Sequence, residues 1–209
     1  MAIPSPIRVL CVDDHPLMRD GIAFALQSQK DMELVGEAID GEGALLLFRE
    51  LRPDVTLMDL QMPGMNGIAT IEAIRKEFPK ARIVVLTTYS GDVQAARALK
   101  AGASGYLLKS MLRNELISTI RTVHSGGRRI PPEIASELAE HFSADALSPR
   151  ELEVLRSVAG GHSNKIVADE LSISEDTVKG HMKSILSKLG ANDRTHAVLI
   201  AIRRGFLDG

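Results

Sequence analysis

Three aspartates in the first third of the chain stand where short apolar runs end. Asp13 and Asp14 close the run IRVLCVDD, and Asp59 closes VTLMD. Thr87 and Lys109 end two further runs, RIVVLT and GYLLK. Clustered carboxylates repel one another, and a hard divalent cation relieves the repulsion, with Mg²⁺ the expected ion. An aspartate beside Mg²⁺ can attack phosphorus, and a Lys and a hydroxyl can share the resulting charge, so the set indicates phosphorylation.

These side chains can meet only if the apolar runs are strands of one sheet. Five such runs recur at intervals of about 25 residues, with amphipathic helical stretches between them, at 7–12, 32–38, 55–58, 82–87 and 105–109. Continuous Val, Ile and Leu runs are typical of strands buried on both faces of a parallel sheet. The alternation predicts an α/β fold with a doubly wound five-stranded parallel sheet. Ligands bind beyond the carboxyl ends of such strands, where all five side chains are expected.

Four stretches carry a resemblance: VDDHPLMRDG, DVTLMDLQMPGMNG, VVLTTYSGD and GASGYLLKS. Over about residues 6–125 the chain resembles the flavodoxin-like receiver domain of bacterial two-component response regulators. The resemblance implies a sensor histidine kinase as phosphodonor. It also implies a set of site residues: the phosphoacceptor Asp59, the Mg²⁺ ligands Asp13, Asp14, Asp59 and the backbone carbonyl of Gln61, the hydroxyl of Thr87, the ammonium of Lys109 and the switch aromatic Tyr106.

Two neighbours of these residues need an interpretation of their own. His15 follows the acid pair, and we interpret it as a solvent-facing loop histidine rather than a metal ligand. Thr88 follows Thr87, and spacing alone allows either hydroxyl to take the same role. His15 is therefore expected to lie outside the site.

Composition and length limit the class of protein. A chain of 209 residues with 44% hydrophobic and 25% charged residues predicts two globular domains. No apolar run approaches the roughly 20 residues that cross a bilayer, and the start lacks the pattern of a signal peptide. The single cysteine, Cys11, excludes a disulfide within the chain. We expect a cytoplasmic protein without a membrane partner.

The alternation of strand and helix patterns ends after residue 125. The stretch SGGRRIPPEIASELAEHFSADA contains two Gly and two Pro, and a short helix is expected within it at 133–142. This gives three segments: a receiver domain at 1–125, a linker at 126–146 and a small all-α domain at 147–209.

The last segment has the pattern of a four-helix helix-turn-helix domain. Ser148 and Glu151 form a capping-box pattern, with helices expected up to Gly160, over 163–171, from Ser174 through Leu189, and over 194–204. The second helix is expected to bury Ile166, Val167 and Leu171. The third should pack Val178, His181, Met182, Ile185 and Leu189, and expose Lys179, Gly180, Lys183 and Ser184. Such an exposed stripe suits a major groove of DNA.

The segment LSPRELEVLRSVAGGHSNKIVADELSISEDTVKGHMKSILSKLG resembles the DNA-binding domain of the NarL/LuxR class. The resemblance implies double-stranded DNA as partner and a homodimer that pairs through the last helix, at 197–204. It implies two sets of contacts: base-facing Lys179, Gly180 and Lys183, and phosphate-facing Ser163, Asn164, Lys165 and Thr177. Gly180 offers no side chain where relatives often have one, so base readout there is expected to be weaker.

The expected function is a transcriptional regulator, not an enzyme, that binds DNA when Asp59 is phosphorylated, with RNA polymerase open as a further partner. One alternative is a DNA-binding regulator with the same fold, whose receiver is not phosphorylated and works through dimerisation or another signal. Another is a Mg²⁺-dependent phosphatase with an aspartyl nucleophile. Such enzymes usually carry a second acid two residues after the nucleophile, where this chain has Gln61.

Overall fold

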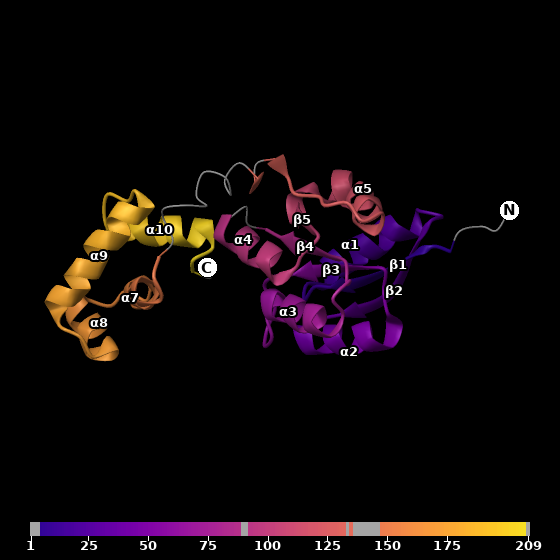
Figure 1. Cartoon of the computed structure of the whole chain (residues 1–209). Coiled ribbons are helices and arrows are strands. Elements are labelled where there is room, and N and C mark those ends of the chain that lie inside the picture. Colours follow the sequence, from indigo (N-terminus) through magenta and orange to yellow (C-terminus); the bar gives the residue numbers. More distant parts are fainter. Residues whose placement is uncertain (1–4, 89–91, 133, 136–146, 208–209) are drawn as a thin grey trace. The chain divides into compact units, whose positions relative to one another are not determined.

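The computed structural model describes residues 5–88, 92–132, 134–135 and 147–207 (Figure 1). The chain divides into two compact units, an α/β unit and an all-α unit, and each is described by itself. The short helix predicted at 133–142 lies almost entirely outside the described residues. Within the described ranges, no helix has the length and apolar character that crossing a membrane requires.

The α/β unit is built on one five-stranded parallel sheet with strand order β2-β1-β3-β4-β5. Its strands are β1 (Ile7–Val12), β2 (Met32–Ala38), β3 (Val55–Asp59), β4 (Ile83–Thr87) and β5 (Gly105–Leu108). Every residue of β3 and β4 is buried, as the continuous apolar runs predicted. The edge strand β2 is instead buried only at its two ends, Met32 and Ala38, and is half-buried or exposed between them. The prediction of a five-stranded parallel α/β fold is confirmed.

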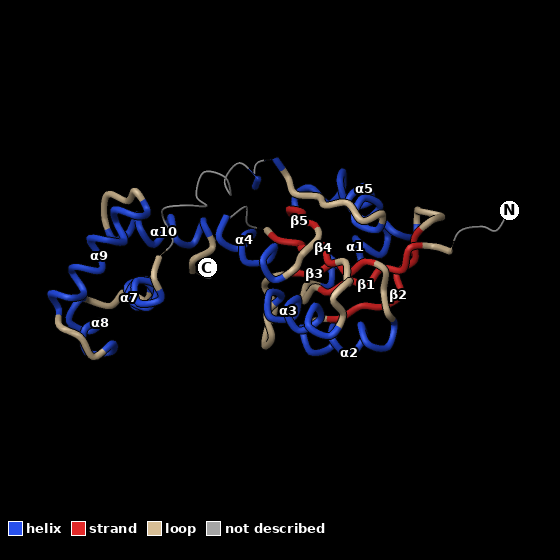
Figure 2. The backbone as a smooth tube through the Cα atoms, viewed as in Figure 1, coloured by secondary structure: helices blue, strands red, loops and turns tan. Residues whose placement is uncertain are grey.

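Helices connect the strands and cover both faces of the sheet (Figures 1 and 2). They are α1 (Pro16–Gln27), α2 (Gly41–Leu51), α3 (Gly67–Glu77), α4 (Asp92–Ala101), the 3₁₀ turn η1 (Lys109–Met111) and α5 (Leu112–His124). Helices α1 and α5 lie on one face, and α2 and α3 on the other. Ile22 and Leu26 of α1 pack with Leu116 and Ile120 of α5 against the central strands. This core holds the carboxyl ends of β1, β3, β4 and β5 in register.

The all-α unit contains α7 (Pro149–Ala159), α8 (Asn164–Leu171), α9 (Glu175–Leu189) and α10 (Arg194–Arg204). The predicted capping box is present: the Ser148 hydroxyl accepts from the Glu151 amide, and the Glu151 carboxylate accepts from the Ser148 amide. Ser172 ends α8 in the left-handed conformation, with φ 53°, and Ser174 caps α9. The short turn between α8 and α9 is therefore as predicted.

The core of this unit corrects one expectation about α8. Val154, Leu155 and Val158 of α7 and the apolar face of α9 form its centre. Val167 is buried and Leu171 partly buried, but Ile166 is 45% exposed and Ala168 is buried instead. In a helix of only two turns, the buried stripe runs through 167, 168 and 171, so the neighbouring position 166 turns outward.

Candidate functional site

The site lies at the carboxyl edge of the sheet, where four strands contribute side chains. Asp13 follows β1, Asp59 ends β3, Thr87 ends β4, and Lys109 follows β5. Asp13 is fully buried, and Asp59 and Thr87 are nearly so. Lys109 begins the 3₁₀ turn η1 rather than ending β5, which differs by one residue from the sequence expectation. The sheet therefore brings together residues far apart in sequence.

The Lys109 ammonium joins two of the aspartates. Its Nζ atom lies 2.8 Å from Asp59 Oδ2 and 2.8 Å from Asp13 Oδ2. The contact with Asp59 is a hydrogen bond. The contact with Asp13 is an ion pair without the direction of a hydrogen bond. Two carboxylates thus share one cation in a buried place, which leaves one negative charge unbalanced.

These contacts shift the pKa values in the site. Burial raises the pKa of Asp59, and the attraction of Lys109 offsets this only in part. Burial alone would lower the pKa of Lys109, but the close contacts with the carboxylates of Asp13 and Asp59 outweigh burial and raise the pKa. The Lys109 side chain is therefore held in its charged form beside the phosphoacceptor candidate.

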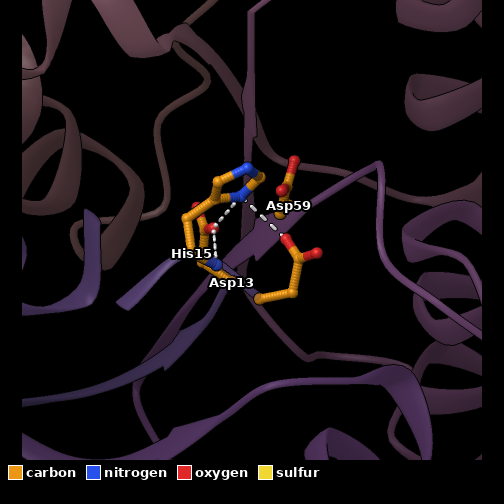
Figure 3. Close-up of side chains that lie close together, drawn as sticks. Asp13, His15 and Asp59 are labelled. Carbon is orange, nitrogen blue, oxygen red and sulfur yellow. Dashed lines mark hydrogen bonds and ion pairs between the residues drawn. The ribbon is translucent and has the colours of Figure 1, made fainter. Parts of the chain in front are cut away.

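His15 lies beside the same carboxylates, although its sequence context predicts a residue outside the site. Its Nδ1 atom is 3.2 Å from Asp13 Oδ1 and 2.8 Å from Asp14 Oδ1. Figure 3 shows the imidazole directed toward Asp13, with Asp59 nearby. Two buried carboxylate oxygens, Asp13 Oδ2 and Asp14 Oδ1, form ion pairs with Lys109 and His15 but no hydrogen bond in the part of the chain that the structure describes.

A divalent cation fits this donor set. One ligand atom from each of Asp13, Asp14, His15 and Asp59 can be chosen so that all four lie within 4.8 Å of one another. Oxygen-rich sites with an excess of negative charge hold divalent cations. The structure therefore brings together the three aspartates predicted as Mg²⁺ ligands and adds His15.

The chain beyond Asp59 is folded tightly against the site. The Gln61 amide donates to Asp59 Oδ1 at 3.3 Å, so its backbone lies close to the acidic cluster, while the role of its carbonyl stays a prediction. The Gly67 amide donates to the Leu60 carbonyl at 3.1 Å. A Cβ atom at Gly67 would clash with the Asp59 carbonyl oxygen, so only Gly fits there.

The aromatic residue predicted as part of the switch, Tyr106, lies in β5 and is fully buried.

In the all-α unit, α9 presents the predicted polar stripe. Lys179, Gly180 and Lys183 are exposed, and a Cβ atom at Gly180 would meet no other atom within 4 Å. Lys179 Nζ lies 2.9 Å from Asp176 Oδ1 on the same exposed surface. Thr177 is exposed beside the cap residue Ser174. The polar residues predicted to contact phosphate at the start of α8 are exposed or half-buried: Ser163, Asn164 and Lys165.

Ser184 does not belong to that exposed stripe, contrary to the sequence expectation. Its hydroxyl donates to Glu151 Oε1 at 2.6 Å, and Lys188 Nζ lies 2.7 Å from Glu151 Oε2. Glu151 is 5% exposed. Burial would raise its pKa, but hydrogen bonds from Lys188, Ser184 and Ser148 lower the pKa to about 2. The capping box identified Glu151 from sequence, but its contact with α9 depends on how the helices pack.

Comparison with known proteins places both units in described families. The response regulator receiver domain family matches residues 9–121, and the luxR family of bacterial regulatory proteins matches residues 145–201. The transcriptional regulatory protein LnrK of Bacillus subtilis is 35% identical over 215 residues, covering 95% of this chain and 98% of LnrK. LiaR of the same organism is 40% identical over 205 residues, covering 94% and 97%.

Two solved structures extend the comparison. The response regulator ChrA of a heme-sensing two-component system is 37% identical, with a TM-score of 0.58 over 97% of this chain and 100% of ChrA. RcsB of Salmonella enterica serovar Typhimurium, bound to the promoter P1flhDC in the presence of the phosphomimetic BeF3⁻, is 28% identical. Its TM-score is 0.74, over 94% of this chain and 98% of RcsB.

Proposed function

The chain belongs to the response regulators that join a receiver domain to a LuxR-family DNA-binding domain, and on that premise we propose that phosphorylation of Asp59 controls its binding to DNA. The observation that carries the proposal is the Lys109 ammonium, 2.8 Å from both Asp59 and Asp13. A sensor histidine kinase is the proposed phosphodonor. The domain division proposed for this activity is 1–125, 126–146 and 147–209.

The proposed roles follow from the buried positions of the side chains. A carboxylate oxygen of Asp59 attacks the phosphorus atom, so a P–O bond forms while the P–N bond to the kinase phosphohistidine breaks and its imidazole leaves. Lys109 neutralises charge on the transferred phosphoryl group. Thr87, buried at the end of the neighbouring strand, is the proposed hydroxyl donor. Asp13, Asp14, Asp59 and the Gln61 carbonyl would hold Mg²⁺, which supplies neutralisation of charge on the phosphoryl oxygens when bound. Tyr106 is the proposed aromatic member of the switch.

The proposed DNA contacts lie on exposed helix surfaces. Lys179 and Lys183 are placed one helical turn apart on α9, where they can reach base edges or phosphates, with Gly180 between them. Ser163, Asn164, Lys165 and Thr177 are the proposed phosphate contacts. Leu199 of α10 is 61% exposed, which supports α10 as the surface of a homodimer on DNA. The DNA-bound RcsB structure supports the same mode of action, and a DNA partner implies a cytoplasmic protein.

Phosphorylation is tested by incubation with Mg²⁺ and acetyl phosphate, followed by intact mass. We expect one added phosphoryl group on the wild type and on Asp20→Asn, an exposed control position, but none on Asp59→Asn. Sizing and DNA footprinting with the same samples then test the switch. If Asp59 takes up no phosphoryl group, the receiver works without phosphorylation, and if DNA affinity and stoichiometry stay equal in both states, the proposed switch is wrong.

A further inference from the structure

The acidic site contains one histidine, His15, beside its aspartates. His15 is 66% exposed, yet its Nδ1 atom does not point freely into solvent, because it contacts carboxylate oxygens of both Asp13 and Asp14 (Figure 3). The ring is not needed for the helix that follows: His15 is the N-cap residue of α1, but no side-chain capping bond is present among the residues described there. The side chain is therefore available for a role in the site.

The distances around Nδ1 are those between neighbouring ligands of one cation. In octahedral coordination with bonds of about 2.1 Å, two ligands at right angles are separated by about 3 Å. The Nδ1 atom lies 2.8 Å from Asp14 Oδ1 and 3.2 Å from Asp13 Oδ1. Asp14 Oδ1 is buried and forms an ion pair with His15 but no hydrogen bond in the described chain, so its lone pairs remain open to a cation. After a small movement of these side chains, one cation can bind Asp13 Oδ1, Asp14 Oδ1 and His15 Nδ1 together.

Imidazole changes which cation such a site prefers. Carboxylates and carbonyls suit Mg²⁺, whereas imidazole nitrogen suits first-row transition ions, which bind N/O sites more strongly from Mn²⁺ toward Cu²⁺. We propose that His15 is a fourth side-chain ligand at the acidic site and that it shifts the site from Mg²⁺ toward divalent transition ions such as Mn²⁺ and Co²⁺. The inference rests on the proposed function in one respect, because it concerns the cation of the same phosphorylation site.

The direct test is pulsed electron paramagnetic resonance of Mn²⁺ bound to the full-length protein, because modulation from ¹⁴N reports an imidazole ligand. We expect this modulation in the wild type and in His124→Ala, a control histidine at the end of α5, and its loss in His15→Ala. The Ala variant keeps the His15 backbone amide that donates to Asp13 Oδ1 at 3.0 Å, so the loop is expected to hold its shape. Asp14→Asn should weaken Mn²⁺ binding and thereby locate the ion.

Titration calorimetry with Co²⁺ and Mg²⁺ supplies a second readout. We expect His15→Ala to reduce the ratio of Co²⁺ to Mg²⁺ affinity at least about tenfold, since even outer partners of metal ligands usually account for 10–100-fold. Mn²⁺ binding that depends on Asp14 but shows no ¹⁴N modulation would overturn this inference and leave the proposed function intact. An unchanged affinity ratio in His15→Ala would overturn it as well. If the wild type binds no cation in a way that Asp14→Asn weakens, then the acidic site holds no cation, and both this inference and the Mg²⁺ role in the proposed function are wrong.

Discussion

Replacing Glu151 by Gln tests how strongly one carboxylate stabilises the DNA-binding unit. The carboxylate accepts from the Ser148 amide at 2.7 Å, from Ser184 at 2.6 Å and from Lys188 at 2.7 Å. It therefore joins the start of α7 to the helix that carries the proposed base contacts. Gln has the same length and keeps an acceptor oxygen, but it has no charge to offer Lys188.

The magnitude follows from the pKa of Glu151, which falls from 4.5 to about 2 because the hydrogen bonds from Lys188, Ser184 and Ser148 outweigh burial. At about 1.4 kcal/mol for each pKa unit, the ionised form stabilises the folded unit by at most about 3.5 kcal/mol more than the protonated form. Since Gln keeps neutral hydrogen bonds, we expect Glu151→Gln to lower the free energy of unfolding by roughly 1–3 kcal/mol at pH 7.

The stability difference between wild type and Glu151→Gln should also depend on pH, in a direction that the lowered pKa of Glu151 fixes. A carboxyl whose pKa is lower in the folded chain stabilises it fully above the unfolded pKa, and this stabilisation is lost as pH falls through the folded pKa. The difference between wild type and Glu151→Gln should therefore be constant near neutral pH and shrink between 4.5 and about 2.

Urea titration of the full-length chain, followed by amide NMR signals of α9, measures this difference at pH 7 and at about pH 3.5. Signals of β3 in the other unit serve as an internal reference. Glu153→Gln is the matched control on α7, since Glu153 pairs with Arg150 on the surface, and little change is expected there. If Glu151→Gln leaves α9 as stable as in the wild type, or if the difference does not shrink in acid, the reasoning from charge is refuted.

Three further predictions concern the two proposed sites. Lys109→Met leaves Asp13 and Asp59 buried without their shared cation, so urea unfolding of the receiver should show a loss of about 3–5 kcal/mol, and acetyl phosphate labelling should fail. Normal stability or normal labelling would contradict this. Gly67→Ala introduces a Cβ atom that clashes with the Asp59 carbonyl, and a loss of about 1–3 kcal/mol is expected in the same titration, whereas no loss would show that the loop adapts. Gly180→Ala adds a Cβ atom to an open helical position, so α9 should gain roughly 0.5–1 kcal/mol, and a loss would reveal a contact not anticipated.

Much of the α/β fold could be predicted because its signals are local. The strands β3 and β4 are continuous apolar runs between helices, and parallel strands place their carboxyl ends at one edge. Asp59 and Thr87 are therefore predictable as members of one site from the sequence alone. The sequence pattern predicts Lys109 as the last residue of the fifth strand, but Lys109 begins η1, because the end of a strand next to a turn is poorly marked by sequence.

The errors arose where packing, not pattern, decides the position of a side chain. Ser184 was expected on the exposed stripe of α9, but the acceptor it bonds lies 33 residues earlier, on Glu151. Ile166 was expected to be buried, but the short helix α8 turns its apolar stripe toward Ala168. His15 was interpreted as a solvent-facing residue, and its exposure agrees, while its contacts with Asp13 and Asp14 depend on the geometry after β1.

The ion pairs of Lys109 with Asp13 and Asp59 join residues that are far apart in the chain, and this has a consequence during protein synthesis. Asp59 lies 50 residues before Lys109, and β5 immediately precedes the Lys, so the ammonium reaches its carboxylates only after the last strand has been added to the sheet. A nascent or truncated receiver that stops short of residue 109 carries the acceptor aspartate without the group that neutralises it. Under the proposed function, such a fragment cannot respond to a kinase, so competence to receive the signal begins only when the receiver is complete.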